Sequence, residues 1–502
     1  MKNEKTSFLS PKLRVIFFAT LGSLTYGYCT SIIATTLGQP SFQRYFGLDT
    51  ASNATDLTGA TNGLYQAGGL IGALSTGWLP DKVGRRKAIL VGAVFCIIGG
   101  ILQTASVHIG MFLAARFVSG YGIGSLVTLV PIWQSEVADA ETRGFLVGLH
   151  GVFILTGYAM ASWIGFAFYF LHLNEQEWRI PIAFQLVFPI LLASGVMGLV
   201  ESPRWLLDQG RVDEALSVVQ SLYPGDHVDQ EFEQMKNQLE LDKAHPSTWK
   251  SIFTVLSYRR RMIIGFLTMF SAQCTGTQVI NNYGPLLYTK MGFGATQQLL
   301  INAGWITIGP FGNLLCAWLM DRVGRKKLMV TGMIGCSVAL FGELLMIALY
   351  EGTTNKSGIS AAVFFLFLHL SIYASTLDAS TYVYASEIWP THIRAKGAAI
   401  STSGLFVGSL IFLMAAPSAF DKIGWKYYLV LLCATIMSAV IFAIFFPETK
   451  GLPLERVGIL FGEAVVPPIE ESICVSDGDL SKAHVKVKAE RDIRGEQEEA
   501  SY

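Results

Sequence analysis

Long runs of apolar residues constrain the fold of this chain more than any other feature of its sequence. Only 15% of the 502 residues are charged, whereas soluble domains carry about a quarter. Each run has about 20 nearly uncharged residues, enough to cross a hydrocarbon core of about 30 Å as a helix. The twelve runs cover residues 14–36, 60–79, 88–107, 109–132, 145–170, 180–200, 262–289, 298–320, 328–350, 360–384, 397–417 and 425–446. The sequence therefore predicts an all-α, multi-pass membrane protein, because runs of this length do not match the short alternating strands of a membrane barrel.

Polar stretches divide the runs into two halves of six. The predicted halves are 14–200 and 261–447, joined by a linker at 201–260 that is typical of short amphipathic helices. Lys and Arg are concentrated in the short segments on the same side as residues 1–13, and the positive-inside rule makes that side cytoplasmic. We therefore expect both termini, the linker and the tail at 448–502 to be cytoplasmic. The N-x-[ST] sequons at Asn53 and Asn355 fall in predicted outer loops, where they are candidate N-glycosylation sites.

Composition and motifs exclude several classes of function. The formal net charge is zero, which disfavours a nucleic-acid partner. The seven Cys residues show neither metal-ligand spacing nor a disulfide framework. The sequence also has no P-loop and no nucleophile elbow, so it predicts neither an enzyme nor an ATP-driven pump. We expect no cofactor and no metal.

The two halves repeat the same charged motifs in the same order. GWLPDKVGRRK at 77–87 returns as AWLMDRVGRKK at 317–327, and a Glu seven residues before an Arg occurs in both halves. Such a duplication indicates a transporter whose halves rock about a shared site. We expect an inner gate in each half, made by Asp81, Arg85, Arg86, Glu136, Arg143 and Glu201, and by Asp321, Arg325, Lys326, Glu387, Arg394 and Glu448. The alternative is that these bases only fix the topology.

These motifs resemble the sugar-porter branch of the major facilitator superfamily, in its fungal form. The resemblance covers residues 14 to 456 and is carried by DKVGRR, RFVSGYGIG, PIWQSEVADAETRG, ESPRWL, DRVGRK, SEIWPTHIRAKG and PETKG. It implies a carrier with twelve transmembrane helices that works by alternating access. It also implies salt-bridge networks at the inner face and a helical cytoplasmic linker.

The first and fourth helices depart from the family at the proton-coupling positions. The family has Asp or Asn where this chain has Cys29, and in proton-coupled members that Asp lies near an Arg that matches Arg116. A thiol is mostly protonated at neutral pH and replaces a titrating carboxylate poorly. An intramembrane Arg is costly without a partner. We therefore keep Cys29 and Arg116 as coupling candidates, with carbonyl capping as the alternative for Arg116.

The sugar-contacting positions also depart from the family. Gly151 replaces a sugar-binding Gln, DASTY at 378–382 replaces Gly-Pro-x-x-Trp, and Leu405 replaces an Asn. Losing amides that hydrogen-bond a pyranose costs about 1–3 kcal/mol for each buried group left unpaired. The pocket is therefore expected to bind a sugar through different residues, or to bind a less hydroxylated polar molecule or an apolar metabolite. The candidate substrate-binding residues are His150, Gln273, Gln278, Asn281, Asn282, Tyr283, Asp378 and Tyr382.

Asp378 is the most informative single position in the second half. It lies nine residues before Glu387, which places it about 13 Å along the helix, near the bilayer midplane, where carboxylates are usually functional. We hypothesise that Asp378 has taken over coupling or substrate pairing from the first helix. The alternative is that it accepts hydrogen bonds from a neighbouring Ser or Tyr, or pairs with His369.

Together these features predict a secondary active or facilitative transporter of a sugar or sugar-like molecule, either a symporter or a uniporter. The alternatives are an exporter of a secondary metabolite or organic acid, and a sugar sensor that no longer transports. We expect the substrate and a proton as small-molecule partners, and a monomer embedded in the plasma membrane.

Overall fold

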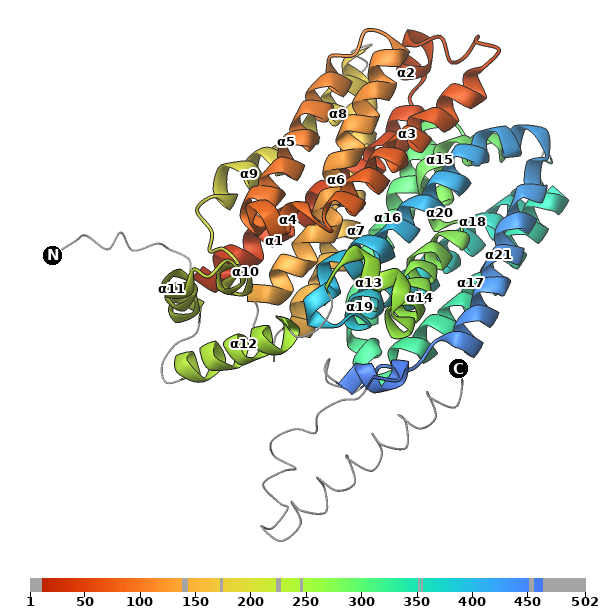
Figure 1. Cartoon of the computed structure of the whole chain (residues 1–502). Helices are drawn as coiled ribbons and strands as arrows, with labels where there is room; N and C mark the ends of the chain where they lie inside the picture. The colour runs from red at the N-terminus through yellow and green to blue at the C-terminus, as the bar shows by residue number, and fades with distance from the viewer. Residues whose placement is uncertain are drawn as a thin grey trace.

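The computed structural model describes residues 11–137, 143–171, 175–222, 227–243, 247–350, 353, 355–450 and 456–463. Within these residues every regular element is a helix, and ten helical segments are long and apolar enough to cross a membrane. The helices α1 and α3 complete the bundle of twelve spans. The buried face of α3 carries the polar residues Thr61, Asn62 and Gln66. The predicted all-α architecture of two six-helix halves is confirmed (Figure 1).

The first half contains six spans, the last of which is broken into two helices. They are α1 (Pro11–Leu37), α3 (Ala54–Ser75), α5 (Arg85–Thr104), α6 (Ile109–Val137), α7 (Arg143–Tyr169), and α8 (Gln176–Phe184) with α9 (Val187–Val196). Two short helices, α2 (Pro40–Tyr45) and α4 (Leu79–Val83), lie between them. The helix α4 ends at Gly84, whose φ of +91° favours glycine, and α5 starts at once. The repeated hairpin motif is therefore a helix end, a glycine turn and a helix start.

The second half follows the same order, with interruptions in two spans. The spans are α14 (Leu256–Cys274) with α15 (Thr277–Lys290), α16 (Ala295–Val323), α17 (Arg325–Tyr350), α18 (Lys356–Tyr373) with α19 (Ala379–Glu387), α20 (Arg394–Lys422) and α21 (Tyr427–Phe445). The sequence predicted the seventh span as one helix, but it breaks at Gly276, which has a φ of +75°. In the tenth span a π-helical turn, η1 (Ala374–Asp378), separates α18 from α19.

Glycines allow the helices α3 and α6 to pack with their backbones in contact. A Cβ added to Gly120 would lie 2.1 Å from the carbonyl oxygen of Tyr65, and one added to Gly124 would lie 2.0 Å from that of Gly69. Membrane helices commonly use such small residues to approach closely, since lipid supplies no hydrophobic drive between them. The first half is therefore held by backbone contact along this pair.

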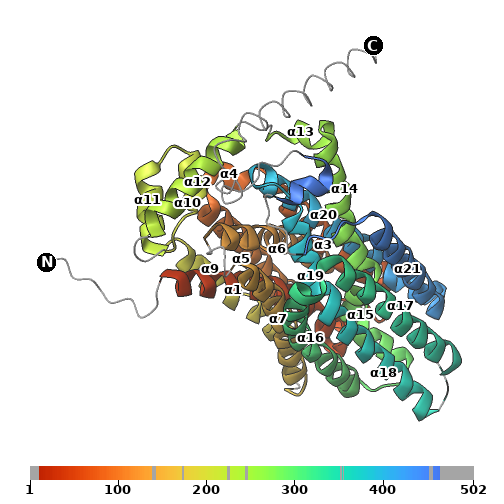
Figure 2. The ribbon, with the colours of Figure 1, turned by 90° about the horizontal axis from the view of Figure 1, so that it is seen from below.

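The linker forms short helices at one end of the bundle. They are α10 (Pro203–Asp208), α11 (Val212–Leu222), α12 (His227–Lys243) and α13 (Trp249–Thr254). Figure 2 shows α10, α11 and α12 gathered beside α4 at that end. Their apolar faces share a small core that includes Leu206, Val219 and Phe232. The linker therefore covers the ends of the first-half helices that carry the charged motifs.

Candidate functional site

Three charged residues of the first half meet at the end of the bundle that carries the linker, which is the predicted inner end. The Arg85 guanidinium donates from Nε and Nη2 to the two carboxylate oxygens of Glu136, at 3.0 and 3.1 Å. Its Nη1 donates to Asp81 at 3.2 Å. Burial raises the pKa of Glu136, but the charge and hydrogen bonds of Arg85 outweigh burial and hold that pKa below its ordinary value. Arg85 therefore joins α4, α5 and α6 in one network.

Glu201 and Arg86 join the same region by capping helix ends. Glu201 accepts hydrogen bonds from the backbone N–H groups of Arg85 and Arg86, at 3.0 and 3.3 Å, and so caps the N-terminus of α5. Burial raises its pKa above the ordinary value, and these hydrogen bonds oppose the rise. Arg86 was expected to pair with an acid, but its side chain donates to the carbonyls of Leu199 and Met197 instead. It satisfies the free carbonyls that follow α9.

The second half contains the corresponding arrangement. Arg325 pairs with Asp321 and with Glu387, each at 3.0 Å. Glu448 accepts from the backbone N–H groups of Arg325 and Lys326, at 2.9 and 3.4 Å, at the start of α17. The contact described for Lys326 is therefore made by its backbone and not by its ammonium group.

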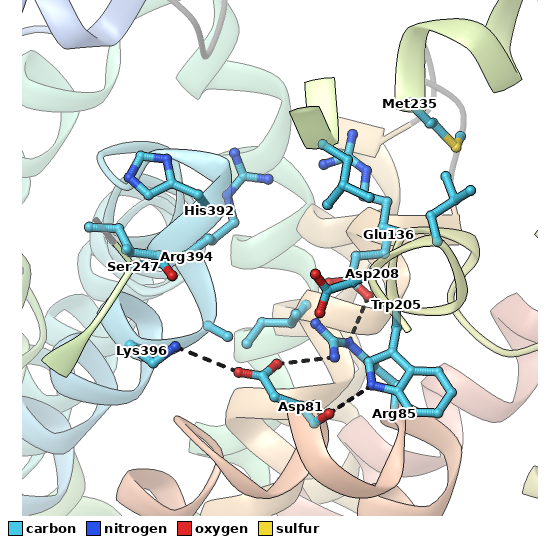
Figure 3. A pocket seen from close by; sticks show the side chains of 16 residues that line it. Asp81, Arg85, Glu136, Trp205, Asp208, Met235, Ser247, His392, Arg394 and Lys396 are labelled. Atoms are coloured by element: carbon cyan, nitrogen blue, oxygen red, sulfur yellow. Dashed lines mark hydrogen bonds and ion pairs between the residues drawn. The ribbon is translucent and has the colours of Figure 1, made fainter. Parts of the chain in front are cut away.

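A cavity of about 250 Å³ lies between the halves at this inner end. It is lined by both halves and the linker, including Asp81, Arg85, Glu136, Arg204, Asp208, Met235, His392, Arg394 and Lys396. In Figure 3 the Lys396 ammonium group faces the Asp81 carboxylate, and their atoms are 3.7 Å apart. This pair connects α20 of the second half to α4 of the first. The side chain of Arg143, also predicted in this network, lies outside the described residues.

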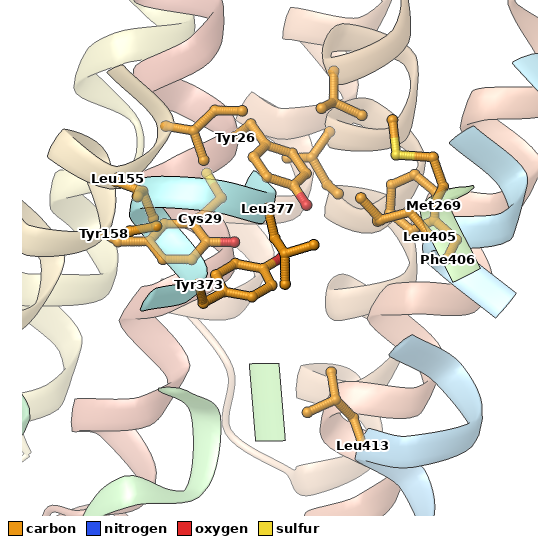
Figure 4. Close-up of a cluster of buried hydrophobic side chains, with 14 of the residues drawn as sticks. Tyr26, Cys29, Leu155, Tyr158, Met269, Tyr373, Leu377, Leu405, Phe406 and Leu413 are labelled. Atoms are coloured by element: carbon orange, nitrogen blue, oxygen red, sulfur yellow. The ribbon is translucent and has the colours of Figure 1, made fainter. Parts of the chain in front are cut away.

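A second cavity lies in the middle of the bundle and is nearly closed, with a volume of about 20 Å³. Small-molecule pockets usually measure about 300–1,000 Å³, so this cavity is far smaller than a usual ligand pocket. Its lining comes from both halves: Ile154, Leu155 and Tyr158 from α7, and Met269, Ala272, Gln273, Thr277, Gln278, Asn281, Trp305, Ile306, Leu370, Tyr373, Asp378, Thr381, Tyr382 and Leu405 from the second half. Figure 4 shows Tyr158 and Tyr373, from opposite halves, close together beside Tyr26.

Asp378 enters this cavity from the π-helical turn. Its Oδ2 accepts a hydrogen bond of 2.7 Å from the Asn313 side chain on α16, and Tyr373 lines the same cavity. The predicted alternative partner His369 is buried elsewhere, with its backbone carbonyl near the Cys336 thiol. Single π-helical turns often mark functional sites, because the extra residue rotates the following side chains. In this protein the π-helical turn η1 ends at Asp378, the residue whose carboxylate enters the cavity.

Gly151 lies against the amide that holds Asp378. A Cβ added to Gly151 would lie 2.9 Å from Asn313 Nδ2 and 3.6 Å from the Ala379 side chain. A side chain at this position would therefore press on the amide that donates to Asp378.

The amides of the seventh span divide into two groups. Gln278 donates to the Tyr158 hydroxyl at 2.9 Å, and Asn281 accepts from Ser31 at 3.5 Å, so both bridge the halves. Gln273 accepts from Ser409 within its own half. Asn282 instead donates back to Gln278, and it is absent from the cavity lining.

Tyr283 lies on the outer side of the central cavity. Its hydroxyl donates to the Leu413 carbonyl at 2.9 Å and lies 3.5 Å from the Thr58 carbonyl on α3. It lines an outer vestibule of about 380 Å³ together with Thr58 and Lys290. Tyr283 therefore separates the central cavity from that vestibule.

Neither His150 nor Arg116 is among the described residues that line the cavity. His150 Nδ1 is 2.7 Å from Ser23 Oγ, and its ring meets the Tyr382 ring edge-on with centroids 6.0 Å apart. Arg116 donates to the backbone carbonyls of Thr61 and Cys29, at 3.2 and 3.3 Å. Its guanidinium carbon also lies 3.7 Å from the Tyr65 ring centroid.

These contacts give Arg116 the carbonyl-capping arrangement that the sequence left as an alternative. The Cys29 side chain is fully buried beside it.

Asn53 and Asn355, the sequon residues, are both exposed at helix starts.

Several cavity residues were not predicted from the sequence. Tyr158, Tyr373 and Trp305 line the cavity, and Lys396 forms the cross-half ion pair. The three aromatic residues lie within apolar runs, where nothing distinguishes them from packing residues. Lys396 was counted only as a topology signal, although its position two residues after Arg394 gave a reason to consider it.

Comparison with known proteins places this geometry in a family. The family model "Sugar (and other) transporter" matches residues 15–461. The chain is 33% identical over 451 residues to the MFS-type transporter criB of Aspergillus cristatus, covering 89% of this chain and 92% of that one. It is 29% identical to the sugar transporter STL1 of Saccharomyces cerevisiae, covering 90% and 82%.

A solved structure shares the fold. The proton:xylose symporter XylE of E. coli, bound to 6-bromo-6-deoxy-D-glucose, superposes with a TM-score of 0.78 at 23% identity, covering 90% of this chain and 99% of that one. Because the family model spans nearly all of the described residues, the chain belongs to the sugar transporter family of the major facilitator superfamily.

Proposed function

We propose that this protein is a secondary active or facilitative transporter that moves a sugar or sugar-like small molecule by alternating access. The nearly closed central cavity between the two halves is the observation that carries this proposal. A cavity of about 20 Å³ holds no sugar, so binding requires the halves to separate on one side at a time. Membership of the family and the names of its relatives, a sugar transporter and a proton:xylose symporter, support the substrate class.

We infer that polar contacts on both sides of the cavity act as gates. On the outer side Tyr283 reaches α3, and Ser418 donates to Asp56 at 3.1 Å across the halves. On the inner side Lys396 pairs with Asp81. The networks around Arg85 and Arg325 hold the helix ends that carry these contacts, and so serve as the rigid parts of the inner gate. Breaking a cross-half contact releases one of the two states.

Asp378 is the residue we assign to substrate pairing or charge coupling, with Gln273, Gln278, Asn281 and Tyr382 as further substrate contacts. It is the one carboxylate among the described residues that line the central cavity. Arg116 and Cys29 are assigned a smaller part, because the guanidinium is held by backbone carbonyls. We also place the protein in the plasma membrane as a monomer with cytoplasmic termini, and we expect Asn53 and Asn355 to accept glycans on the outer side.

Uptake of a substrate panel into proteoliposomes tests this function. The panel contains hexoses, pentoses, polyols and amine-bearing sugars, each assayed with and without an inward proton gradient. We expect saturable uptake of at least one member, and loss of gradient-driven accumulation in the Asp378→Asn variant. If that variant takes up substrate as well as the wild type does, both with and without the gradient, Asp378 has no role in coupling or in substrate pairing.

The apolar part of the cavity wall supports a second candidate, export of a less polar metabolite. Ile154, Leu155, Met269 and Leu405 face the same space as the polar groups. Inside-out vesicles, assayed with the same panel and with an added apolar ring compound, separate the two directions. Transport of an apolar ring compound without any transport of a sugar would favour this second candidate.

A further inference from the structure

Among the described residues, the central cavity contains a carboxylate without a cation to neutralise it. None of the described residues that line the cavity is Lys, Arg or His. Asp378 takes no part in the ion pairs of the described residues, and the donor that its carboxylate meets is the neutral Asn313 amide. His150, whose ring contacts that of Tyr382, is engaged with Ser23. Burying an unpaired charge is costly unless something pairs with it.

Aromatic rings surround this carboxylate. Tyr158, Tyr373, Tyr382 and Trp305 line the same cavity, from α7, α18, α19 and α16. The faces of such rings attract cations by about 0.5–2 kcal/mol, and more strongly when the site excludes water. A carboxylate with several rings around it is therefore complementary to an organic cation.

We propose that the transported molecule carries a protonated amine that pairs with Asp378, so that the cavity takes an amino sugar or a similar amine-bearing small molecule. This inference rests on the proposed function, in which the central cavity is the transport site. The ring of the substrate packs on Tyr158 and Tyr382, and Gln278 and Asn281 bind its hydroxyl groups. A neutral sugar leaves the charge of Asp378 uncompensated, and an organic acid is repelled by it.

Two pairs of compounds that differ by one group test this inference. Glucosamine is compared with glucose, and tyramine with 4-(2-hydroxyethyl)phenol, at a pH at which both amines are protonated. Affinity is measured on the purified full-length protein by quenching of tryptophan fluorescence, and transport by uptake into proteoliposomes. We expect the amine of at least one pair to bind at least about tenfold more tightly than its alcohol, as a charge-assisted hydrogen bond would give.

Three variants assign this preference to Asp378. Asp378→Asn should bring the amine-to-alcohol ratio close to one, and Asp378→Glu should keep it. Glu343→Gln is the matched control. Glu343 is a fully buried carboxyl residue of α17 beside Tyr288 and Tyr428, and it does not line the cavity. Its amide variant should leave the preference unchanged.

The outcomes distinguish this inference from the function on which it rests. Equal binding of amine and alcohol by the wild type, or an amine preference that survives in Asp378→Asn, overturns the inference and leaves sugar transport standing. A protein that neither binds nor transports any of the four compounds, and transports none of the wider substrate panel, contradicts the inference and the proposed function together.

Discussion

At the scale of single residues, the inner networks depend on two arginines that each hold acids from different helices. The side chains of Arg85 and Glu136 are 10% and 13% exposed, and two parallel hydrogen bonds join them. A bidentate pair of this kind fixes orientation as well as charge. Removing one partner leaves the other charge buried, which costs more than the pair itself contributes.

We predict that Glu136→Gln lowers the free energy of unfolding by about 3 kcal/mol. This value is at the lower end of the range for breaking a buried ion pair, because Asp81 still faces Arg85. The measurement is thermal unfolding of the purified protein in detergent. The control is Glu214→Gln, which removes the exposed partner of Arg211 in the linker and should leave the midpoint unchanged. Equal midpoints for Glu136→Gln and the wild type would contradict the prediction.

The same pair sets a pH dependence. The pKa of Glu136 is below its ordinary value in the folded protein, so its contribution is fully present above the unfolded pKa of about 4.3 and is lost as pH falls through the folded pKa. The difference in stability between wild type and Glu136→Gln should therefore be constant near neutral pH and shrink in acid. Unfolding midpoints measured across this pH range check the sign, and a difference that grows in acid would contradict it.

At the scale of helices, close packing and local breaks position the site. The helices α3 and α6 touch backbone to backbone, whereas α14 breaks into α15 at Gly276 and α18 into α19 at η1. The rigid pair lies in the first half, and both breaks lie beside the cavity in the second half. Broken spans with irregular backbone are tolerated where they line a cavity inside the protein.

Gly124→Ala should disrupt the first half, because its Cβ would lie 2.0 Å from the Gly69 carbonyl oxygen. We expect a loss of folded protein well beyond the cost of an ordinary surface change. Gly304→Ala is the matched control within another span, since its Cβ meets only Phe367 at 3.8 Å. Folded yield and melting temperature measure both variants, and similar values for the two would show that α3 and α6 are free to separate.

The sequence predicted the helices better than the cavity, for reasons that these elements show. Apolar length and charged ends are local properties, so the twelve spans and the repeated motifs were readable from the residues alone. Which side chain faces the cavity depends on helix rotation, and the break at Gly276 changes that rotation. Asn282 and Tyr283 were therefore predicted as substrate contacts, although Asn282 packs on Gln278 and Tyr283 lies at the outer vestibule. The contact of Asn313 with Asp378 needed three-dimensional information, because 65 residues separate them.

At the scale of the whole molecule, two similar halves meet around a cavity that is closed on both sides. The halves pack extensively along α3 with α20 and along α7 with α16, and polar contacts such as Gln278 with Tyr158 and Lys396 with Asp81 join them as well. Such weak polar contacts suit the proposed exchange between two states. The stronger networks around Arg85 and Arg325 lie within each half, and under this proposal they move with it.

Lys396→Ala should shift the population toward the state that is open to the cytoplasm. The Lys396 and Asp81 side chains are 18% and 40% exposed, so the pair contributes about 1 kcal/mol or less, and a shift of roughly fivefold is the most we expect. Reactivity of a cysteine placed at Thr381 in the cavity wall, measured with a membrane-impermeant thiol reagent from each side, reports the shift. Greater reactivity from the outer side would contradict it.

The most direct test of the central claim, that the halves rock about the cavity, is a pair of distances measured by electron–electron double resonance. Spin labels at the exposed Lys82 and Lys327 report the inner end, and labels at the exposed Thr50 and Lys422 report the outer end, after replacement of Cys433 and Cys474. We predict that adding a transported substrate, or introducing Lys396→Ala, changes the two distances in opposite directions. Two distances that stay fixed, or that always change in the same direction, would contradict the account.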